Sequence, residues 1–269
     1  MDKIMLTEEK ETLLIPLYGK AMENKKNNPI LIDKKASEIV NGIDYDFNSL
    51  KIAEKTNIMM CIRAKIIDDY LKDFLAKENE NTVLHLGCGL DSRYLRVNAD
   101  NAYWYDVDFE DVINIRKHFY SETDKYHMIG SSVTQSEWLA EISSNKSNIV
   151  IAEGLFMYLK EDEIKTLIGR LCDKLKSYNL IFDAYSTLTA KQAKNHPSLK
   201  KTGAKINWGI DDAKEFEKFG EEIKFIDEMF FSESKEIDKL NASTRIVFKA
   251  ANHFSAARKA HRILVFEVK

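Results

Sequence analysis

The sequence is poor in the residues that mark several specialised classes of protein. Its 269 residues include 3 cysteines, Cys61, Cys88 and Cys172, which are too few and too scattered for a disulfide framework. We therefore expect a reducing compartment, the cytoplasm. No cysteine or histidine pair has the spacing of zinc ligands, so we expect no metal. No apolar run approaches the length of a membrane span, and the opening residues lack the apolar core of a signal peptide, so we expect no membrane partner.

Net charge is also small. Lys and Arg number 40 against 43 Asp and Glu, which gives a formal net charge of −3. A surface for nucleic acid needs concentrated basic residues to neutralise phosphates, so we expect no nucleic-acid partner. Apolar residues make up 44% of the chain and charged residues 31%, proportions that are typical of a soluble globular protein.

Prolines are few, with 3 in the whole chain, and no repeat or linker divides it, so we expect a single domain over residues 1–269.

Before Thr82 the pattern is helical. The clearest helix spans residues 58–77, where apolar side chains recur at the three-to-four spacing of one buried face, namely Ile62, Ile66, Ile67, Tyr70, Leu71 and Phe74. An upstream helix ends at Gly42, as helices often do at glycine. Residues 1–81 are therefore predicted to form an N-terminal helical cap.

From Thr82 onward, apolar strands alternate with amphipathic helices. We predict strands at residues 82–87, 102–108, 148–154, 179–185, 223–231 and 262–269, and helices at residues 109–120, 135–142, 160–175, 211–220 and 243–260. Alternation of this kind predicts an α/β fold with a mostly parallel, Rossmann-like sheet and helices on both faces. The direction of the last strand stays open, antiparallel included, because that strand follows a helix late in the sequence.

A glycine turn ends the first predicted strand, at Gly87-Cys88-Gly89. In open α/β sheets ligands bind beyond the carboxyl ends of the strands, and missing side chains let a ligand touch the backbone there. The dinucleotide fingerprint wants Gly or Ala three places after the second glycine, where this chain has Ser92. Asp91 would also repel a pyrophosphate. The turn therefore favours a different nucleoside cofactor, and a tight turn without a ligand is the alternative.

Two acidic residues, Asp106 and Asp108, end the second strand roughly twenty residues after the glycines, the distance at which a carboxylate can accept hydrogen bonds from ribose hydroxyls. Strand alternation puts both on one face. We favour Asp108, which is nearer the strand end, as the ribose ligand, with Asp106 as its neighbour. Solvated carboxylates at a strand exit are the alternative.

Three further residues suit the same cofactor. Ser132 and Val133 could flank an adenine ring, although the polar residues around them could equally cap the following helix. Glu153 ends an apolar run and needs a cationic or donor partner, because an unpaired carboxylate is costly to bury. An amine-bearing cofactor would supply that partner, and a loop arginine, Arg93 or Arg96, is the alternative.

Four segments, "LHLGCGLDSRYLR", "YDVDFEDVINIRK", "SSVTQSEWL" and "IAEGLFMYL", resemble in this order the leucine carboxyl methyltransferase family, and more closely its branch of tetracenomycin-synthesis-type O-methyltransferases. The resemblance extends from about Thr12 to the end of the chain. It implies a class I methyltransferase fold, S-adenosyl-L-methionine as cofactor, and an inserted segment on the substrate side at about residues 186–212. The implied activity is methyl transfer to a phenol or carboxylate of a small molecule. By analogy with the family, the carboxylate of a protein C-terminus is the alternative acceptor.

The resemblance also implies roles for single residues. The residues that it assigns to cofactor binding are Lys20 and Arg63 at the methionine carboxylate, Gly87 in the turn, Asp108 at the ribose, Ser132 and Val133 at the adenine, and Glu153 near the amino-acid end. From the turn and the strand themselves we add Gly89 and Asp106 to this set. A guanidinium suits this task because it grips a carboxylate with two parallel hydrogen bonds. Without the resemblance, Arg63 could equally be a residue at the rim of the apolar face whose charged head reaches solvent.

The choice of acceptor decides whether a base is needed. A carboxylate is already ionised, whereas a phenol, with a pKa of about 10, would gain from a base. Tyr158, Tyr185 and His196 are the candidates, and each could equally serve packing or capping. Two other classes of function stay open, an NAD(P)-dependent oxidoreductase and a cofactor-binding module without catalysis.

Overall fold

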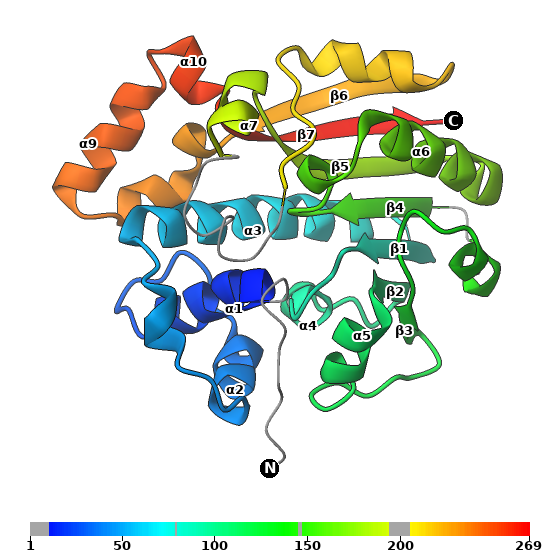
Figure 1. The fold of residues 1–269 in the computed structure, drawn as a ribbon, viewed down its shortest axis with the longest axis horizontal. Coiled ribbons are helices and arrows are strands. Elements are labelled where there is room, and N and C mark those ends of the chain that lie inside the picture. Colours follow the sequence, from blue (N-terminus) through cyan, green and yellow to red (C-terminus); the bar gives the residue numbers. More distant parts are fainter. Residues whose placement is uncertain (1–10, 79, 145–146, 194–204) are drawn as a thin grey trace.

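The computed structural model describes residues 11–78, 80–144, 147–193 and 205–269. These residues form one sheet of seven strands in the order β3-β2-β1-β4-β5-β7-β6 (Figure 1). The strands are β1 (Asn81–Leu86), β2 (Ala102–Asp108), β3 (Tyr126–Gly130), β4 (Ser147–Ala152), β5 (Tyr178–Tyr185), β6 (Ile223–Phe230) and β7 (His261–Val268). Strands β1 to β5 run parallel, and β7 lies antiparallel between β5 and β6. The predicted mostly parallel sheet is confirmed, and the last strand takes the antiparallel direction.

The sequence analysis missed β3, which pairs with β2 at one edge of the sheet. The strand has only 5 residues, YHMIG, and its polar and apolar side chains do not alternate clearly. Edge strands are often short because a long exposed edge would recruit other chains. Short, irregular patterns of this kind give too little periodicity to recognise.

The helices cover both faces of the sheet and its carboxyl end. They are α1 (Glu11–Glu23), α2 (Lys34–Gly42), α3 (Glu54–Leu75), α4 (Arg93–Val97), α5 (Glu110–Arg116), α6 (Glu161–Leu175), α7 (Thr187–Ala193), α9 (Ala242–Ala251) and α10 (Ser255–Arg258), with shorter 3-10 helices η2 (Phe47–Leu50), η3 (Glu137–Glu141), η4 (Phe156–Tyr158), η5 (Ala213–Phe219), η6 (Phe231–Glu233) and η7 (Lys235–Lys239). Three predicted helices need correction. Residues 135–142 and 211–220 contain 3-10 helices instead of α-helices, and residues 243–260 divide into α9 and α10 because Phe254 adopts an extended backbone.

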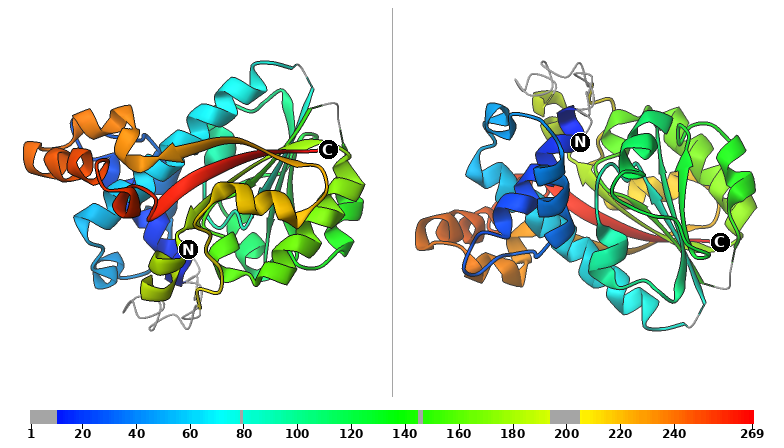
Figure 2. Two further views of the ribbon diagram at one scale, coloured as in Figure 1. Left: turned by 90° about the horizontal axis from the view of Figure 1, so that it is seen from above. Right: turned by 90° about the horizontal axis from the view of Figure 1, so that it is seen from below.

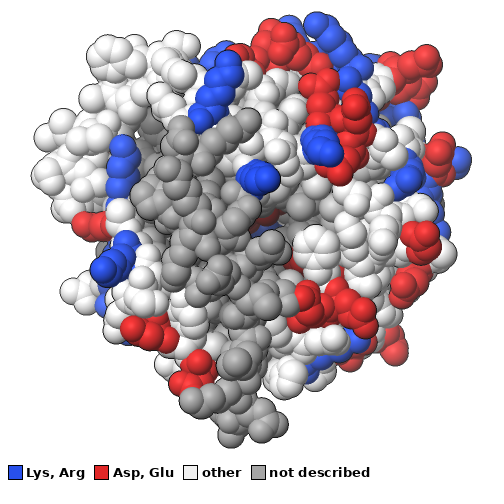
Figure 3. Space-filling view, in the orientation of Figure 1, with Lys and Arg blue, Asp and Glu red and all other residues white. Residues whose placement is uncertain are grey.

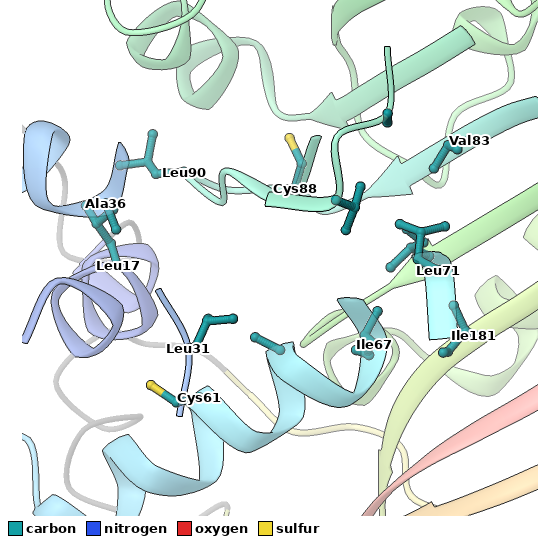
Figure 4. Close-up of a cluster of buried hydrophobic side chains, with 14 of the residues drawn as sticks. Leu17, Leu31, Ala36, Cys61, Ile67, Leu71, Val83, Cys88, Leu90 and Ile181 are labelled. Atoms are coloured by element: carbon teal, nitrogen blue, oxygen red, sulfur yellow. The ribbon is translucent and has the colours of Figure 1, made fainter. Parts of the chain in front are cut away.

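Both faces of the sheet are buried, because alternate side chains of each strand enter two separate cores. On β1, Val83 faces α3 and the N-terminal helices, and Figure 4 shows it near Ile67 and Leu71 of α3. Leu84 and Leu86 face the opposite way, toward α6 and η5. The central strands β1 and β4 are buried on both faces, as is usual for parallel strands covered by helices on both sides.

The N-terminal helices pack on one another and on α3, beyond the carboxyl ends of the parallel strands (Figure 1). In both views of Figure 2, α1 and α2 lie at the same end of the molecule as α9 and α10. The predicted face of α3 is confirmed, since Ile62, Ile67 and Leu71 are fully buried. The same helix buries Arg63 and Asp68, which shows that its inner face serves more than packing.

Basic and acidic side chains are interspersed over the face that Figure 3 shows. Within the described part of the chain, no helix combines the length and the apolar character needed to cross a membrane.

Candidate active site

A large cavity opens at the carboxyl ends of the parallel strands. Its volume is 1790 Å³, and its walls come from α1, α3, the loops that follow β1, β2, β3 and β4, the end of β5 and the start of β7. Pockets for single small ligands usually measure about 300–1,000 Å³. This cavity therefore has room for a cofactor together with a second small molecule.

The glycine turn forms part of the cavity wall. Gly87 and Gly89 have φ values of 63° and 52°, in the left-handed region that side chains disfavour. A Cβ atom on Gly87 would lie 3.1 Å from Leu155 Cδ1, and one on Gly89 would lie 3.1 Å from Leu13 Cδ2. Glycine at these two positions keeps both the backbone path and the free space above it.

Asp108 is fixed against this turn. Its Oδ2 accepts a hydrogen bond from the Gly89 amide and its Oδ1 accepts one from the Phe109 amide, each at 2.7 Å. The carboxyl group lines the cavity, and burial raises its pKa above the ordinary value, an effect that the two amide donors oppose. Asp108 is thus oriented by the backbone while its remaining acceptor capacity faces the cavity.

Asp106 occupies a different position, below the cavity wall. Its carboxylate accepts hydrogen bonds from Arg116, from Tyr126 at 2.6 Å and from Trp104 at 2.9 Å. Burial alone would raise the pKa of Asp106, but Arg116 and His85 hold it below its ordinary range. Asp106 is not among the residues that line the cavity, so its visible task is to join β2 to its neighbours.

Ser132 and Val133 line the cavity in the loop after β3. The Ser132 hydroxyl lies 2.8 Å from the hydroxyl of Thr134. The N-cap of the following helix η3 is Ser136, whose side chain makes no capping hydrogen bond. The loop therefore does not act as a side-chain cap for the helix, and Ser132 stays at the cavity wall.

Glu153 follows β4 and is held by two arginines. Its Oε1 accepts a hydrogen bond from Arg63 Nε at 2.8 Å, and its Oε2 accepts one from Arg93 Nη2. Arg93 is one of the two arginines named as alternative partners, and the structure places both on α4 instead of in a loop. Arg96 pairs with other acids. Burial alone would raise the pKa of Glu153, but Arg93 and Arg63 hold it well below its ordinary range.

Arg63 also contacts a second acid, because its Nη1 lies 3.0 Å from Asp183 Oδ2. Its Nη2 makes no hydrogen bond to any described residue and lies near Gly154, where a Cβ atom would be only 3.4 Å from it. The side chain is buried rather than extended toward solvent at the rim. Lys20, at the end of α1, places its Nζ 2.5 Å from Asp91 Oδ1 and lines the same cavity.

These groups belong to one buried ionic network under the cavity. Among the described residues it contains four cations and five carboxylates connected by ion pairs: Lys20, Arg63, Arg93 and Arg96 with Asp33, Asp68, Asp91, Glu153 and Asp183. The described part of the ionic network therefore has one more negative than positive charge. A buried excess charge is costly unless it is paired, so the site suits a ligand with a net positive charge.

Two of the three candidate bases lie at the cavity. Tyr158 and Tyr185 line the cavity, and burial raises the pKa of both phenols, that of Tyr185 to about 12. Both hydroxyls are therefore protonated at neutral pH and suited to donate hydrogen bonds. His196 lies outside the described residues.

The sequence analysis missed two residues that meet at this site, Asp183 on β5 and His261 at the start of β7. His261 Nε2 lies 2.6 Å from Asp183 Oδ2, and His261 lines the cavity. Asp183 could have been recognised as a candidate, because it is an acid within the mostly apolar strand at residues 179–185. His261 could not, because it lies among polar residues at the start of its strand.

Fold and site together define a class I methyltransferase. The structure resembles that of a magnesium protoporphyrin IX methyltransferase, ChlM from Synechocystis PCC 6803, with a TM-score of 0.52, 12% sequence identity and coverage of 88% of this chain and 94% of that chain. Within this class the chain belongs to the leucine carboxyl methyltransferase family, whose sequence profile matches residues 14–172. The resemblance seen in the sequence is thereby confirmed.

Two methyltransferases are similar to the chain over most of its length. It is 36% identical over 271 residues to the tetracenomycin polyketide synthesis O-methyltransferase TcmP of Streptomyces glaucescens, covering 98% of each chain. It is 28% identical over 251 residues to the S-adenosyl-L-methionine-dependent methyltransferase dpfgK of Gibberella zeae, covering 85% of this chain and 84% of that one.

Proposed function

We propose that this protein is an S-adenosyl-L-methionine-dependent O-methyltransferase whose acceptor is a small molecule. Both relatives are methyltransferases, one named for methyl transfer to oxygen and the other for the cofactor. The observation that carries the proposal is the cavity in which the glycine turn, the oriented Asp108 carboxyl and the negatively charged ionic network meet. A protein C-terminus as acceptor and a nicotinamide cofactor find no comparable support.

The nucleoside half of the cofactor would lie along the glycine turn. Asp108, whose orientation is set by two backbone amides, would accept hydrogen bonds from the ribose hydroxyls. Gly87 and Gly89 would let the sugar approach the backbone, and Ser132 and Val133 would flank the adenine with one polar and one apolar contact. We assign Asp106 a supporting role, since it fixes β2 from below.

The amino-acid half would lie over the ionic network. The free Nη2 of Arg63 and the ammonium of Lys20 suit the carboxylate of the cofactor, and Glu153 suits its ammonium. The cofactor carries a sulfonium, an ammonium and a carboxylate, so its net positive charge matches the one excess negative charge of the network. When bound, it supplies a methyl group activated on sulfur.

The chain's own residues would mainly align the acceptor with that methyl group, which is catalysis by proximity and orientation. We assign the acceptor side to the segment at residues 186–212, from which Thr189, Gln192 and Ile206 line the cavity. The protonated hydroxyls of Tyr158 and Tyr185 would donate hydrogen bonds to the acceptor there.

We also propose that the protein works in the cytoplasm and uses no metal ion. All three cysteines are free, which fits the reducing cytoplasm. No group of three or more metal-ligating side chains occurs among the residues that the structure describes.

Titration calorimetry tests the cofactor site. S-adenosylhomocysteine should bind the parent protein, and Asp108→Asn should weaken binding about 10- to 100-fold, because it replaces hydrogen bonds to a charged group with neutral ones. Asp69→Asn is the matched control, since Asp69 lies on the surface of α3 and, among the described residues, pairs with Lys65 alone. The affinity of this variant should equal that of the parent. Absence of binding to the parent, or equal affinity of both variants, would refute the assignment.

A further inference from the structure

Arg116 is a buried arginine that is bonded to the glycine turn. It is the last residue of α5, and its side chain is fully buried. Its Nη1 donates hydrogen bonds to the carbonyl oxygens of Gly89 and Asp91, each at 2.8 Å. Its Nη2 donates to the Asp106 carboxylate and, at 2.9 Å, to the Tyr126 hydroxyl. One guanidinium therefore ties the turn after β1 to both β2 and β3.

The turn needs such an anchor because its own residues leave the backbone free. Gly87 and Gly89 both adopt positive φ values, and glycine restricts the backbone less than any other residue. Arg116 holds the carbonyl of Gly89, while the amide of Gly89 donates to Asp108 Oδ2 at 2.7 Å. Both backbone groups of Gly89 are thus fixed, one by Arg116 and the other by the carboxyl group that we assign to the ribose.

The guanidinium keeps its charge in this buried place and acts on Asp108 as well. Burial alone would lower the pKa of Arg116, but Asp106 holds it above its ordinary range. Burial raises the pKa of Asp108, and Arg116 opposes that rise together with the two backbone amides that bind the carboxyl group. Arg116 therefore favours the ionised form of Asp108, in which both oxygens only accept hydrogen bonds.

We propose that Arg116 is a positioning residue of the cofactor site, because it holds the glycine turn, and through Gly89 the Asp108 carboxyl, where the nucleoside half of S-adenosylmethionine would bind. The inference rests on the proposed methyltransferase function and adds one residue to its site. Arg116 is not among the described residues that line the cavity, so it acts through the turn and not by contact with the cofactor. A guanidinium suits this task, because one terminal nitrogen reaches two carbonyls while the other reaches a carboxylate.

Arg262 on β7 provides a matched control. It is also fully buried. Its Nη2 donates to the carbonyl oxygens of Ile210 and Asp211, each at 3.0 Å, and its Nε binds the Glu228 carboxylate. Arg262 therefore makes the same kinds of bond as Arg116, but with segments other than the glycine turn, and it is absent from the described lining of the cavity. Replacing either arginine leaves two carbonyls and one acid without their cation, and only the change at Arg116 reaches the turn.

Binding of S-adenosylhomocysteine, measured by titration calorimetry, tests the proposal in the parent, Arg116→Met, Arg116→Lys and Arg262→Met. Thermal unfolding of each variant identifies a common temperature at which all of them are folded. We expect Arg116→Met to weaken binding about 10- to 100-fold, the loss that is typical of metal sites when a side chain that orients a ligand-binding residue is removed. Arg116→Lys should lose less, because lysine keeps the charge but donates from a single nitrogen. Arg262→Met should lose stability as Arg116→Met does and yet bind with the affinity of the parent.

A double-mutant cycle separates positioning from a general loss of structure. In the Asp108→Asn background, Arg116→Lys should weaken binding by a smaller factor than it does in the parent, because both changes impair the same contact with the ribose. Arg116→Lys keeps the test decisive if Arg116→Met does not fold.

Three outcomes would overturn the proposal while leaving the methyltransferase function intact. They are parent-like affinity in the folded Arg116 variants, a loss of affinity in Arg262→Met as large as in Arg116→Met, and a loss caused by Arg116→Lys that is the same with and without the Asp108 carboxylate. Failure of the parent to bind S-adenosylhomocysteine would instead remove the proposed function itself.

Discussion

Replacing Arg93 by methionine would remove one cation from the ionic network while leaving a long side chain in its place. Arg93 is fully buried, with Nε 2.7 Å from Asp68 Oδ1 and Nη1 3.3 Å from Asp91 Oδ2, and it also binds Glu153. Each of these acids keeps another partner, because Arg96 pairs with Asp68 and Asp91, and Arg63 pairs with Glu153. The variant would therefore bury one additional unmatched negative charge rather than three.

Removing one partner from a buried ion pair costs about 3–5 kcal/mol. Because a single uncompensated charge results, we expect Arg93→Met to lower the free energy of unfolding by about that amount. For a chain of this size such a loss corresponds to a melting temperature lower by roughly 10 °C. Lys249→Met is the matched control, because the Lys249–Asp238 pair is 60% and 68% exposed. Exposed pairs contribute no more than about 1 kcal/mol.

Urea unfolding followed by tryptophan fluorescence measures both variants, since Trp104 and Trp138 are buried and report on the core. A loss in Arg93→Met no larger than in Lys249→Met would refute the reasoning. It would mean that the ionic network adapts to the missing cation, by protonation of an acid or by entry of water, at little cost.

Two further predictions concern pH and thiol reactivity. The pKa of Glu153 is lowered in the folded protein, so its contribution to stability is complete above its unfolded pKa, about 4.3, and is lost as the pH falls. The difference in unfolding free energy between the parent and Arg93→Met should therefore shrink on acidification, and a constant difference down to the acid transition would contradict this. Burial raises the pKa of the Cys61 thiol to about 12 and also raises the pKa of the Cys88 thiol. Cys172, in contrast, is half-buried. Dithionitrobenzoate should therefore label one thiol rapidly in the native parent and none in Cys172→Ser, and fast labelling of a second thiol would count against the burial.

The sheet was predictable where side chains follow a clear period. Strands such as β1 and β4 contain short apolar runs bounded by turns. The residues that follow them, Gly87 and Glu153, could be assigned to the cavity because parallel strands present their carboxyl ends together. The pairing of Glu153 with Arg63 was not predictable, since it depends on how α3 packs against β4. The approach of His261 to Asp183 likewise depends on the register of β7 with β5, which the sequence of neither strand encodes alone.

The position of β7 has a consequence for how the protein is made. This strand comes last in the order of the described strands, yet it lies between β5 and β6. Until it is synthesised, β5 has an open edge and β6 has no partner in the sheet. Open edges of apolar strands invite pairing with other chains, and contacts that join late and early segments form slowly. During translation the sheet therefore stays incomplete, with an apolar edge open to pairing, until β7 has left the ribosome and fills the place between β5 and β6.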